Sequence, residues 1–184
     1  MPHTATPSSA PALPPRWLII ALLALPQIAE TILAPALPDL ARHWRLDAAT
    51  TQPVMGIFFV GFACGVLVWG QLADAWGRRP ALLTALAISL AGTLGAVAAP
   101  TYAWLLAGRF VQAFGLAACS VVTQTLLRDC LAGERLTRYF VTLGAVLAWS
   151  PAVGPLTGQL VAQRQGYAGA VSYTHLTLPT ILLV

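Results

Sequence analysis

The sequence predicts an all-α membrane protein, because it is strongly apolar and its apolar residues fall into long runs joined by short polar segments. Apolar residues make up 58% of the 184 residues and charged residues only 9%, and the mean hydropathy is +0.74. A soluble domain of this length is much more polar. A membrane core about 30 Å thick needs roughly 20 apolar residues per helix. Five runs are long enough, at residues 17–37, 53–72, 81–99, 102–126 and 139–161.

Positive charge is spread over short loops and predicts the orientation of these helices. The net charge is +4 and all the cations are arginines, but they form no single basic patch of the kind that binds nucleic acid. A cytoplasmic N-terminus places more arginines inside than outside, as the positive-inside rule requires. The inner set is then Arg16, Arg78, Arg79, Arg128, Arg135 and Arg138, against Arg42, Arg45 and Arg164 outside.

Composition divides the chain into three parts. Residues 1–15 are rich in Pro, Ala, Ser and Thr, so we expect a disordered cytoplasmic tail. Residues 16–166 hold the five apolar runs and should form one transmembrane bundle. The first of these runs is too long for the apolar core of a secretory signal. Residues 167–184 are polar at first and are broken by Pro179. We expect a truncated sixth helix here and, from about Val171, a segment foreign to the bundle.

No metal or cofactor site is expected. Cys64 and Cys119 lie inside apolar runs and Cys130 lies beside a polar segment, with none of the spacing that marks disulfides or metal ligands. Enzyme activity is disfavoured as well, because the apolar runs hold no Ser/His pair and no HExxH motif. We interpret the cysteines as small packing residues.

The first run carries an acid in the middle of a membrane helix. Gln27, Glu30 and Thr31 are spaced so that they share one helical face. Pro26 and Pro35 should bend or end this helix. An acid at this depth is costly and usually faces a bundle interior or an aqueous path. Glu30 therefore marks either an ion or substrate pathway or a structural bond to a neighbouring helix.

The second and third runs each carry a stripe of small residues. Small residues about four apart allow helices to pack closely in lipid, where no hydrophobic force drives them together. We interpret both stripes as packing surfaces. They comprise Gly56, Gly61, Gly65 and Gly70 in the second run, and Ala85, Ser89, Gly92 and Ala96 in the third.

The fourth run places a cation about two turns inside the membrane. Arginine stays charged in proteins, so its position inside the membrane costs free energy and requires an explanation. One hypothesis is function within the bundle, and the alternative is a side chain that snorkels to the membrane surface. A mostly polar stripe at helical spacing comprises Arg109, Gln112, Leu116, Ser120 and Thr123.

A dense polar turn is predicted at residues 70–80, between the second and third runs. Gly70 should let the helix end approach its neighbour, and Pro80 suits the first turn of the next helix. After the fourth run, Arg128 and Asp129 begin a charged loop, which a salt bridge could tie to Asp74 and its neighbours. Such a bridge would either gate the cytoplasmic side or be an ordinary surface pair of little energy.

The fifth run ends in a segment that combines helix-distorting and helix-packing residues. Pro151 and Pro155 are four apart, as are Gly154 and Gly158. The prolines should distort this helix and the glycines should let a partner lie against it.

Three of these segments resemble motifs of the major facilitator superfamily. GQLADAWGRRP resembles its signature loop between helices two and three, with Ala75 where a basic residue is usual. RFVQAFG resembles a motif of helix four in proton-coupled members, with Ala113 replacing a glycine. SPAVGPLTGQ resembles an antiporter motif, with Ser150 and Gln159 replacing two glycines. The residues that match the signature loop are Gly70, Asp74, Gly77, Arg78 and Arg79.

Together with ETILAPALPDLA, these motifs resemble the Bcr/CflA group of drug-efflux transporters over residues 17–166. The resemblance implies proton-coupled antiport of drugs or amphipathic metabolites, in a bacterial inner membrane, with the proton gradient as the energy source and no cofactor. It implies a fold of two halves with the transport site between them. This chain would then be the N-terminal half, with five helices and a truncated sixth.

The resemblance also implies partners and roles. The expected partners are the lipid bilayer, protons, a small amphipathic or cationic substrate and the missing C-terminal half. Glu30 would alternate between proton and cationic substrate, although it lies one place earlier than the aspartate that is frequent in the group. Arg109 would bias its protonation.

Two other hypotheses stay open at this point. In a nutrient or metabolite carrier of the same superfamily, Arg109 would bind an anionic group directly. A half-bundle that does not transport would instead be a membrane scaffold or a dead fragment.

Overall fold

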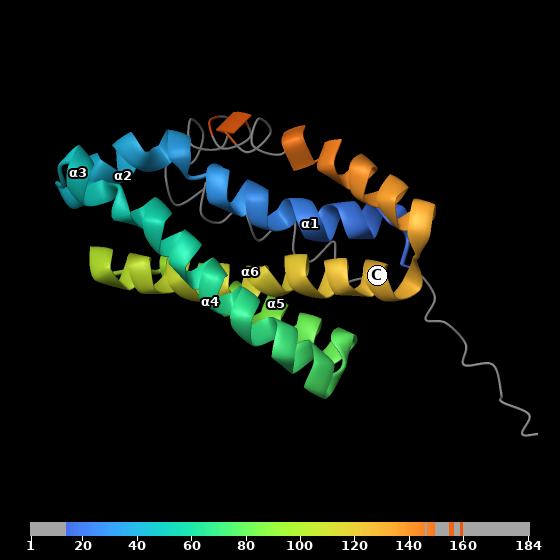
Figure 1. Cartoon of the computed structure of the whole chain (residues 1–184). Helices are drawn as coiled ribbons and strands as arrows, with labels where there is room; N and C mark the ends of the chain where they lie inside the picture. The colour runs from blue at the N-terminus through green and yellow to red at the C-terminus, as the bar shows by residue number, and fades with distance from the viewer. Residues whose placement is uncertain (1–13, 146, 150–154, 157–158, 160–184) are drawn as a thin grey trace, which may run out of the picture.

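The chain is built from helices joined by short turns, as the computed structural model shows for residues 14–145, 147–149, 155–156 and 159 (Figure 1). No strand occurs in this part of the chain, which confirms the all-α class. A further helical stretch follows at residues 133–145. The preceding elements are α1 (Arg16–Thr31), the 3-10 turn η1 (Ala34–Ala36), α2 (Leu37–Trp44), α3 (Ala48–Thr51), α4 (Pro53–Trp76), α5 (Arg78–Val97) and α6 (Tyr102–Cys130).

Four of the five predicted membrane spans are confirmed. Helical segments long and apolar enough to cross a bilayer are Arg16–Trp44, Ala49–Trp76, Arg78–Val97 and Tyr102–Cys130. The fifth predicted span is helical at its start, but most of its second half lies outside the described residues. So do the predicted tails, apart from residues 14 and 15.

The first span is interrupted before its end. Helix α1 includes Pro26, which is buried, and ends at Thr31. The chain then makes the short turn η1, which contains Pro35. Because proline has no backbone N–H, Pro35 cannot donate the hydrogen bond that would continue the helix. Because α1 ends at Thr31, other carbonyl groups in its last turn are also available to donors from elsewhere.

The turn between α4 and α5 is much shorter than predicted. Helix α4 continues to Trp76 and α5 starts at Arg78, so Gly77 alone joins them. Gly77 has a φ of 88°, a conformation that glycine adopts without steric cost. Pro80 lies in the first turn of α5, as expected. The prediction was wrong because polar side chains at a helix end have the composition of a loop.

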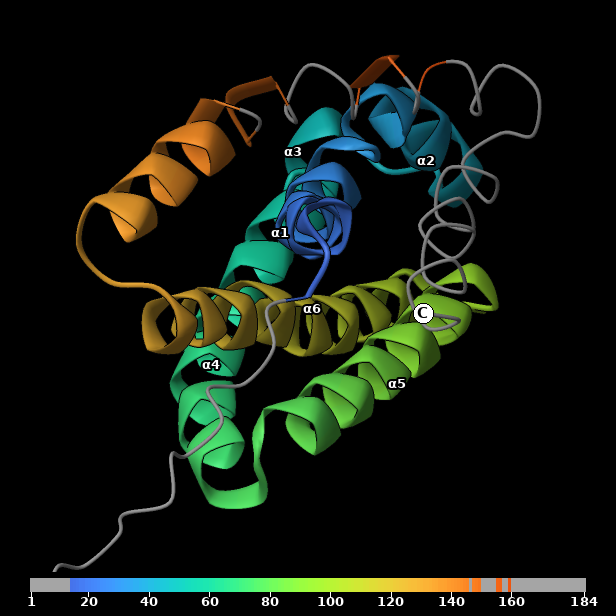
Figure 2. The same cartoon turned by 90° about the vertical axis from the view of Figure 1, so that its right-hand side faces the viewer.

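Helix α6 is the centre of the bundle. It contacts α1, α4 and α5, and Figure 2 shows α1 and α5 on opposite sides of it. In the most apolar stretch of the span formed by α6, 61% of the residues are buried. In the corresponding stretch of the span Ala49–Trp76, which contains α4, only 28% are buried. Large apolar side chains such as Phe59 and Leu67 remain exposed on α4, which suits a surface that faces lipid.

Glycine contacts bring the neighbouring helices against the α6 backbone. A Cβ atom added to Gly61 or Gly65 of α4 would clash with the carbonyl oxygen of Phe110 or Phe114. One added to Gly92 of α5 would clash with the backbone of α6 as well. The packing role of both stripes is thus confirmed at these positions, since only glycine fits there.

The packing role predicted for Gly70 is wrong. A Cβ atom there would lie 3.7 Å from Cγ1 of Val121, which is an ordinary contact, and one on Gly56 would meet nothing within 4 Å. Both positions therefore accept a larger residue, because helices that cross at an angle bring their backbones together only near the crossing point.

Trp69 completes the contact between α4 and α6. Its side chain is only 1% exposed, and its Nε1 donates a hydrogen bond of 2.8 Å to the carbonyl oxygen of Phe114. The same oxygen faces Gly65. A residue too large at position 65 would therefore disturb both the helix spacing and this hydrogen bond.

Alanine substitutions along α4 test this packing. We expect Gly65→Ala to destabilise the bundle by about 1–3 kcal/mol, because the added methyl group overpacks the contact with α6. Gly56→Ala and Gly70→Ala are matched controls on the same helix, and each should be neutral or stabilising by up to about 1 kcal/mol. Thermal unfolding in detergent, followed by circular dichroism, measures the difference. Equal melting of the three variants would contradict the packing argument.

Candidate functional site

A buried arginine marks the candidate site. Arg109 lies about two turns inside α6 and its side chain is only 1% exposed. Its Nη1 donates to Oε1 of Gln112 at 2.6 Å and to the carbonyl oxygen of Ala29 in α1 at 3.3 Å. Its guanidinium carbon lies 4.6 Å from the centre of the Phe58 ring on α4. The snorkelling alternative is therefore wrong, because three helices enclose this cation.

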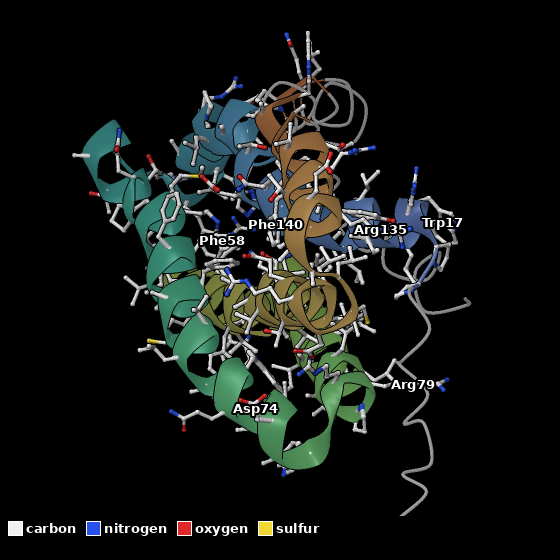
Figure 3. The ribbon with its side chains drawn as sticks, turned by 45° about the vertical axis from the view of Figure 1, so that its right-hand side comes forward. Trp17, Phe58, Asp74, Arg79, Arg135 and Phe140 are labelled. Carbon is white, nitrogen blue, oxygen red and sulfur yellow. The ribbon has the colours of Figure 1, made fainter. Side chains whose placement is uncertain are left out.

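Each neighbour of Arg109 offsets part of the cost of burying a charge, which amounts to several kcal/mol for an isolated ion. Hydrogen bonds to a charged donor are stronger than neutral ones, and the face of the Phe58 ring attracts a cation. Ala29 lies in the last turn of α1, so its carbonyl also belongs to the negative end of the helix dipole. Figure 3 shows Phe58 pointing from α4 into the bundle.

Glu30 supplies the opposite charge. It is half-buried in the last turn of α1, directly after the carbonyl that binds Arg109, and the two side chains attract each other electrostatically. Thr31 donates through Oγ1 to the carbonyl oxygen of Gln27 at 2.9 Å, so its hydroxyl is used within α1. From the predicted set, the structure brings Gln112 into contact with Arg109 and places Glu30 next to Ala29, whose carbonyl joins α1 to Arg109 of α6.

The guanidinium of Arg109 has binding capacity beyond these contacts. It carries five N–H donors, and among the described residues its Nε and Nη2 have no hydrogen-bond partner. An additional acceptor from water or from a substrate would satisfy them. The site can thus hold one fixed positive charge, one titratable acid and a further acceptor.

Beyond Gln112, which binds Arg109, the polar stripe on α6 extends away from this site. Gln112 and Thr123 are buried and Ser120 is half-buried. Ser120 lies eleven residues beyond Arg109, or about three helical turns. The stripe is therefore confirmed as an inward face of α6, but Ser120 does not join the Arg109 cluster.

Sequence reasoning missed two members of the site. Phe58 lies within an apolar run and carries no signal that separates it from its neighbours. The carbonyl of Ala29 is a backbone group, which any residue would provide. The one signal in the sequence is Pro35, which predicts that the helix ends nearby. The end of a helix leaves carbonyl groups of its last turn without helical partners.

An ion pair joins the ends of α5 and α6 at the end of the bundle predicted to be cytoplasmic. Asp129 belongs to the last turn of α6 and not to a loop, and it pairs with Arg78 at the start of α5. The predicted tie to the segment around Asp74 is therefore confirmed, with Arg78 as the partner; Asp74 itself is exposed on α4 (Figure 3) and makes no ion pair within the described part of the chain. Arg128 lies over the ring of Phe140 at 5.9 Å instead.

The remaining predicted residues do not join a common site. Gly70 is half-buried, and Gly77 and Arg79 are exposed. Pro155 is helical and half-buried, whereas Pro151, Gly154 and Gly158 lie outside the described residues. Among the residues that the structure does describe, no group of three His, Cys, Asp or Glu side chains is placed to hold a metal ion.

Comparison with known proteins identifies relatives over most of the chain. Residues 19–183 match the family model described as Major Facilitator Superfamily. An uncharacterized transporter of Rickettsia bellii is 33% identical over 169 residues, which are 92% of this chain and 42% of that protein. The matched residues include most of residues 167–184, whose assignment as a truncated or foreign tail stays a prediction.

Two further relatives are named for drug resistance. Multidrug resistance protein D of Escherichia coli is 31% identical over 78% of this chain and 36% of its own length. A chloramphenicol resistance protein of Pseudomonas aeruginosa is 34% identical over 77% of this chain and 34% of its own length. The chain thus spans less than half the length of each of these relatives.

A double-mutant cycle tests the contact between Arg109 and Phe58. We expect Arg109→Gln and Phe58→Leu to show a coupling of about 0.5–2 kcal/mol in unfolding free energy, because each removes the cation–ring attraction. Phe59→Leu is the matched control, since Phe59 is 54% exposed and should show no coupling to Arg109→Gln. Chemical unfolding in detergent provides the free energies. The same coupling for both phenylalanines would contradict the contact.

A second cycle tests the pair of Arg78 and Asp129. Their side chains are 30% and 43% exposed, so we expect Arg78→Gln and Asp129→Asn to couple by at most about 1 kcal/mol. The coupling should fall at high salt, because ions screen exposed charges. Asp74→Asn should show none with Arg78→Gln. Unfolding measured at low and high salt distinguishes the two acids, and coupling of Arg78 to Asp74 but not to Asp129 would contradict the ion pair.

Proposed function

The chain belongs to the Major Facilitator Superfamily of membrane transporters, and on that basis we propose that it is part of a drug exporter driven by the proton gradient. The single observation that carries this proposal is that the buried, permanently charged Arg109 binds the carbonyl of Ala29, directly beside the half-buried acid Glu30. Such a pair inside a helix bundle provides a site where a proton and a cation compete for one carboxylate.

In the proposed cycle, Glu30 carries the transported proton. Arginine does not release its proton in proteins, so the titrating member of the pair is Glu30. An ionised Glu30 attracts a cationic substrate, and a proton that binds Glu30 from outside removes this attraction. The substrate then leaves outside and the proton leaves inside, which couples export to proton entry. Gln27 and Thr31 lie on the same helical face and would line this path.

Arg109 has two roles in this proposal. Its fixed charge biases the protonation of Glu30 electrostatically. It also holds α6 to the end of α1 through the carbonyl of Ala29. A change in the charge of Glu30 would therefore alter the balance of forces between α1 and α6, where the two helices meet.

The proposal extends to the rest of the transporter. The transport site of such folds lies between two halves that rock against each other, and we propose that this chain supplies the N-terminal half. The pair of Arg78 and Asp129 would latch the cytoplasmic end. The segment with Pro151, Gly154, Pro155 and Gly158 would serve the antiporter role of the motif that it resembles.

The drug-resistance names of two relatives support export of drug-like compounds. The resemblance to the Bcr/CflA group supports the same direction of transport. A bacterial inner membrane with the N-terminus in the cytoplasm agrees with the distribution of arginines.

One observation favours a second candidate, a carrier of anionic nutrients or metabolites. Nε and Nη2 of Arg109 have no partner among the described residues, and a guanidinium binds carboxylates and phosphates with two parallel hydrogen bonds. In that case Arg109 would bind substrate directly, and Glu30 would only balance its charge.

Substitution of Glu30 tests the coupling. In cells that express the complete product of the gene, we expect Glu30→Gln to reduce export of a cationic dye to the level of cells without the transporter, because glutamine cannot exchange a proton. Asp39→Asn is the matched control: it removes one acid from the neighbouring helix α2, where Asp39 pairs with Arg42, and should leave export intact.

Two further measurements separate the candidate functions. Dissipating the proton gradient should abolish export in the wild-type cells. Proton-driven export that persists in Glu30→Gln, at normal expression, would remove the coupling role. Uptake of an anion that is lost in Arg109→Gln but not in Glu30→Gln would instead support the carrier.

A further inference from the structure

A cavity of about 610 Å³ lies between the start of α1 and the helical residues 133–145. It lies at the start of α1, whereas Arg109 contacts the end of that helix at Ala29. The cavity therefore takes no part in the site described above. Its lining has two chemical parts. Arg16, Arg135 and Arg138 contribute positive charge, whereas Ile20, Leu131 and Leu143 contribute apolar surface.

The positive charge of this cavity is only partly balanced within the protein. Among the described residues of the lining, Glu134 is the single acid, and it pairs with Arg138 at 2.6 Å. Nε of Arg16 donates to the hydroxyl of Tyr139 at 3.1 Å, which leaves its charge intact. Arg135 has no ion pair or hydrogen bond among the described residues. The lining thus retains an excess of positive charge.

The apolar part of the cavity continues into the protein core. Leu143 is only 4% exposed and packs with Ile19, Leu23 and Leu127. Ile20 and Leu131 are half-buried around the same cluster. A small inorganic anion would gain nothing from this surface. An amphiphile with a negative head and apolar chains would satisfy both parts.

The position of the cavity fits the membrane surface. Arg16 is the first residue of the first membrane-spanning segment, so the cavity lies where the apolar span begins. Trp17 follows it and is 49% exposed. Tryptophan favours the interface between lipid tails and water. The negative head groups of phospholipids lie at this level, and basic pockets between membrane helices bind them.

We propose that the cavity lined by Arg16, Arg135 and Arg138 binds the head-group phosphate of an anionic phospholipid, with the acyl chains along Ile20, Leu131 and Leu143. The bound lipid bridges α1 and the helix at residues 133–145, adding to the polar contact between Arg16 and Tyr139. It thereby supports the position of that helix at the membrane surface.

Native mass spectrometry of the purified chain with added phosphatidylglycerol tests this proposal. We expect Arg135→Gln to weaken lipid binding about fivefold, the loss of one arginine contact at a membrane surface, and Arg135→Lys to retain it. Arg135→Gln removes no ion pair of the described residues, so its fold should persist, as circular dichroism would verify. Phosphatidylcholine, which has no net charge, should bind much more weakly than phosphatidylglycerol.

Arg79→Gln is the matched control. Arg79 is an exposed arginine outside this cavity, at the end of the bundle predicted to face the same leaflet, and Figure 3 shows it apart from Arg135. It should bind phosphatidylglycerol as the wild type does. Equal binding by wild type and Arg135→Gln would overturn the proposal, as would an equal loss in Arg79→Gln. Displacement of the lipid by inorganic phosphate would identify a site for free anions instead.

Discussion

The α6 backbone around Phe110 and Phe114 lies directly against Gly61 and Gly65 of α4, while Gly92 of α5 meets the backbone at Gln112. In lipid, no hydrophobic force presses helices together, so contact at the level of the backbone carries much of the packing. Because Gln112 also binds Arg109, the contact that holds α5 to α6 helps to position the candidate site. The fold and the site thus depend on the same few glycines.

The ending of α1 connects local sequence to the chemistry of the site. Helix α1 ends at Thr31, so its last turn offers a free carbonyl and the negative end of its dipole. Ala29 directs this carbonyl at Arg109, and Glu30 adds a full negative charge beside it. A permanently charged residue is thereby stabilised inside a membrane bundle, next to an acid that can gain and lose a proton.

At the end of the bundle predicted to face the cytoplasm, the charged side chains are partly exposed and not buried. There the ion pair of Arg78 and Asp129 is partly exposed and contributes little to stability, whereas the contact between Arg16 and Tyr139 leaves a positive charge unbalanced. Water and lipid head groups can satisfy such charges, so they cost little. The same excess of arginine that sets the orientation of the helices also provides the chemistry of an anionic lipid site.

The sequence by itself determined the four confirmed spans, the inward stripe with Arg109 and the presence of an acid in α1. Hydropathy and helical periodicity are local properties, so they can be read directly from the amino-acid sequence. Only the tertiary structure decided which glycines of α4 touch α6, that Arg78 is the residue that pairs with Asp129, and that Phe58 reaches Arg109. These outcomes depend on where the helices cross and how each is rotated, which local sequence does not specify.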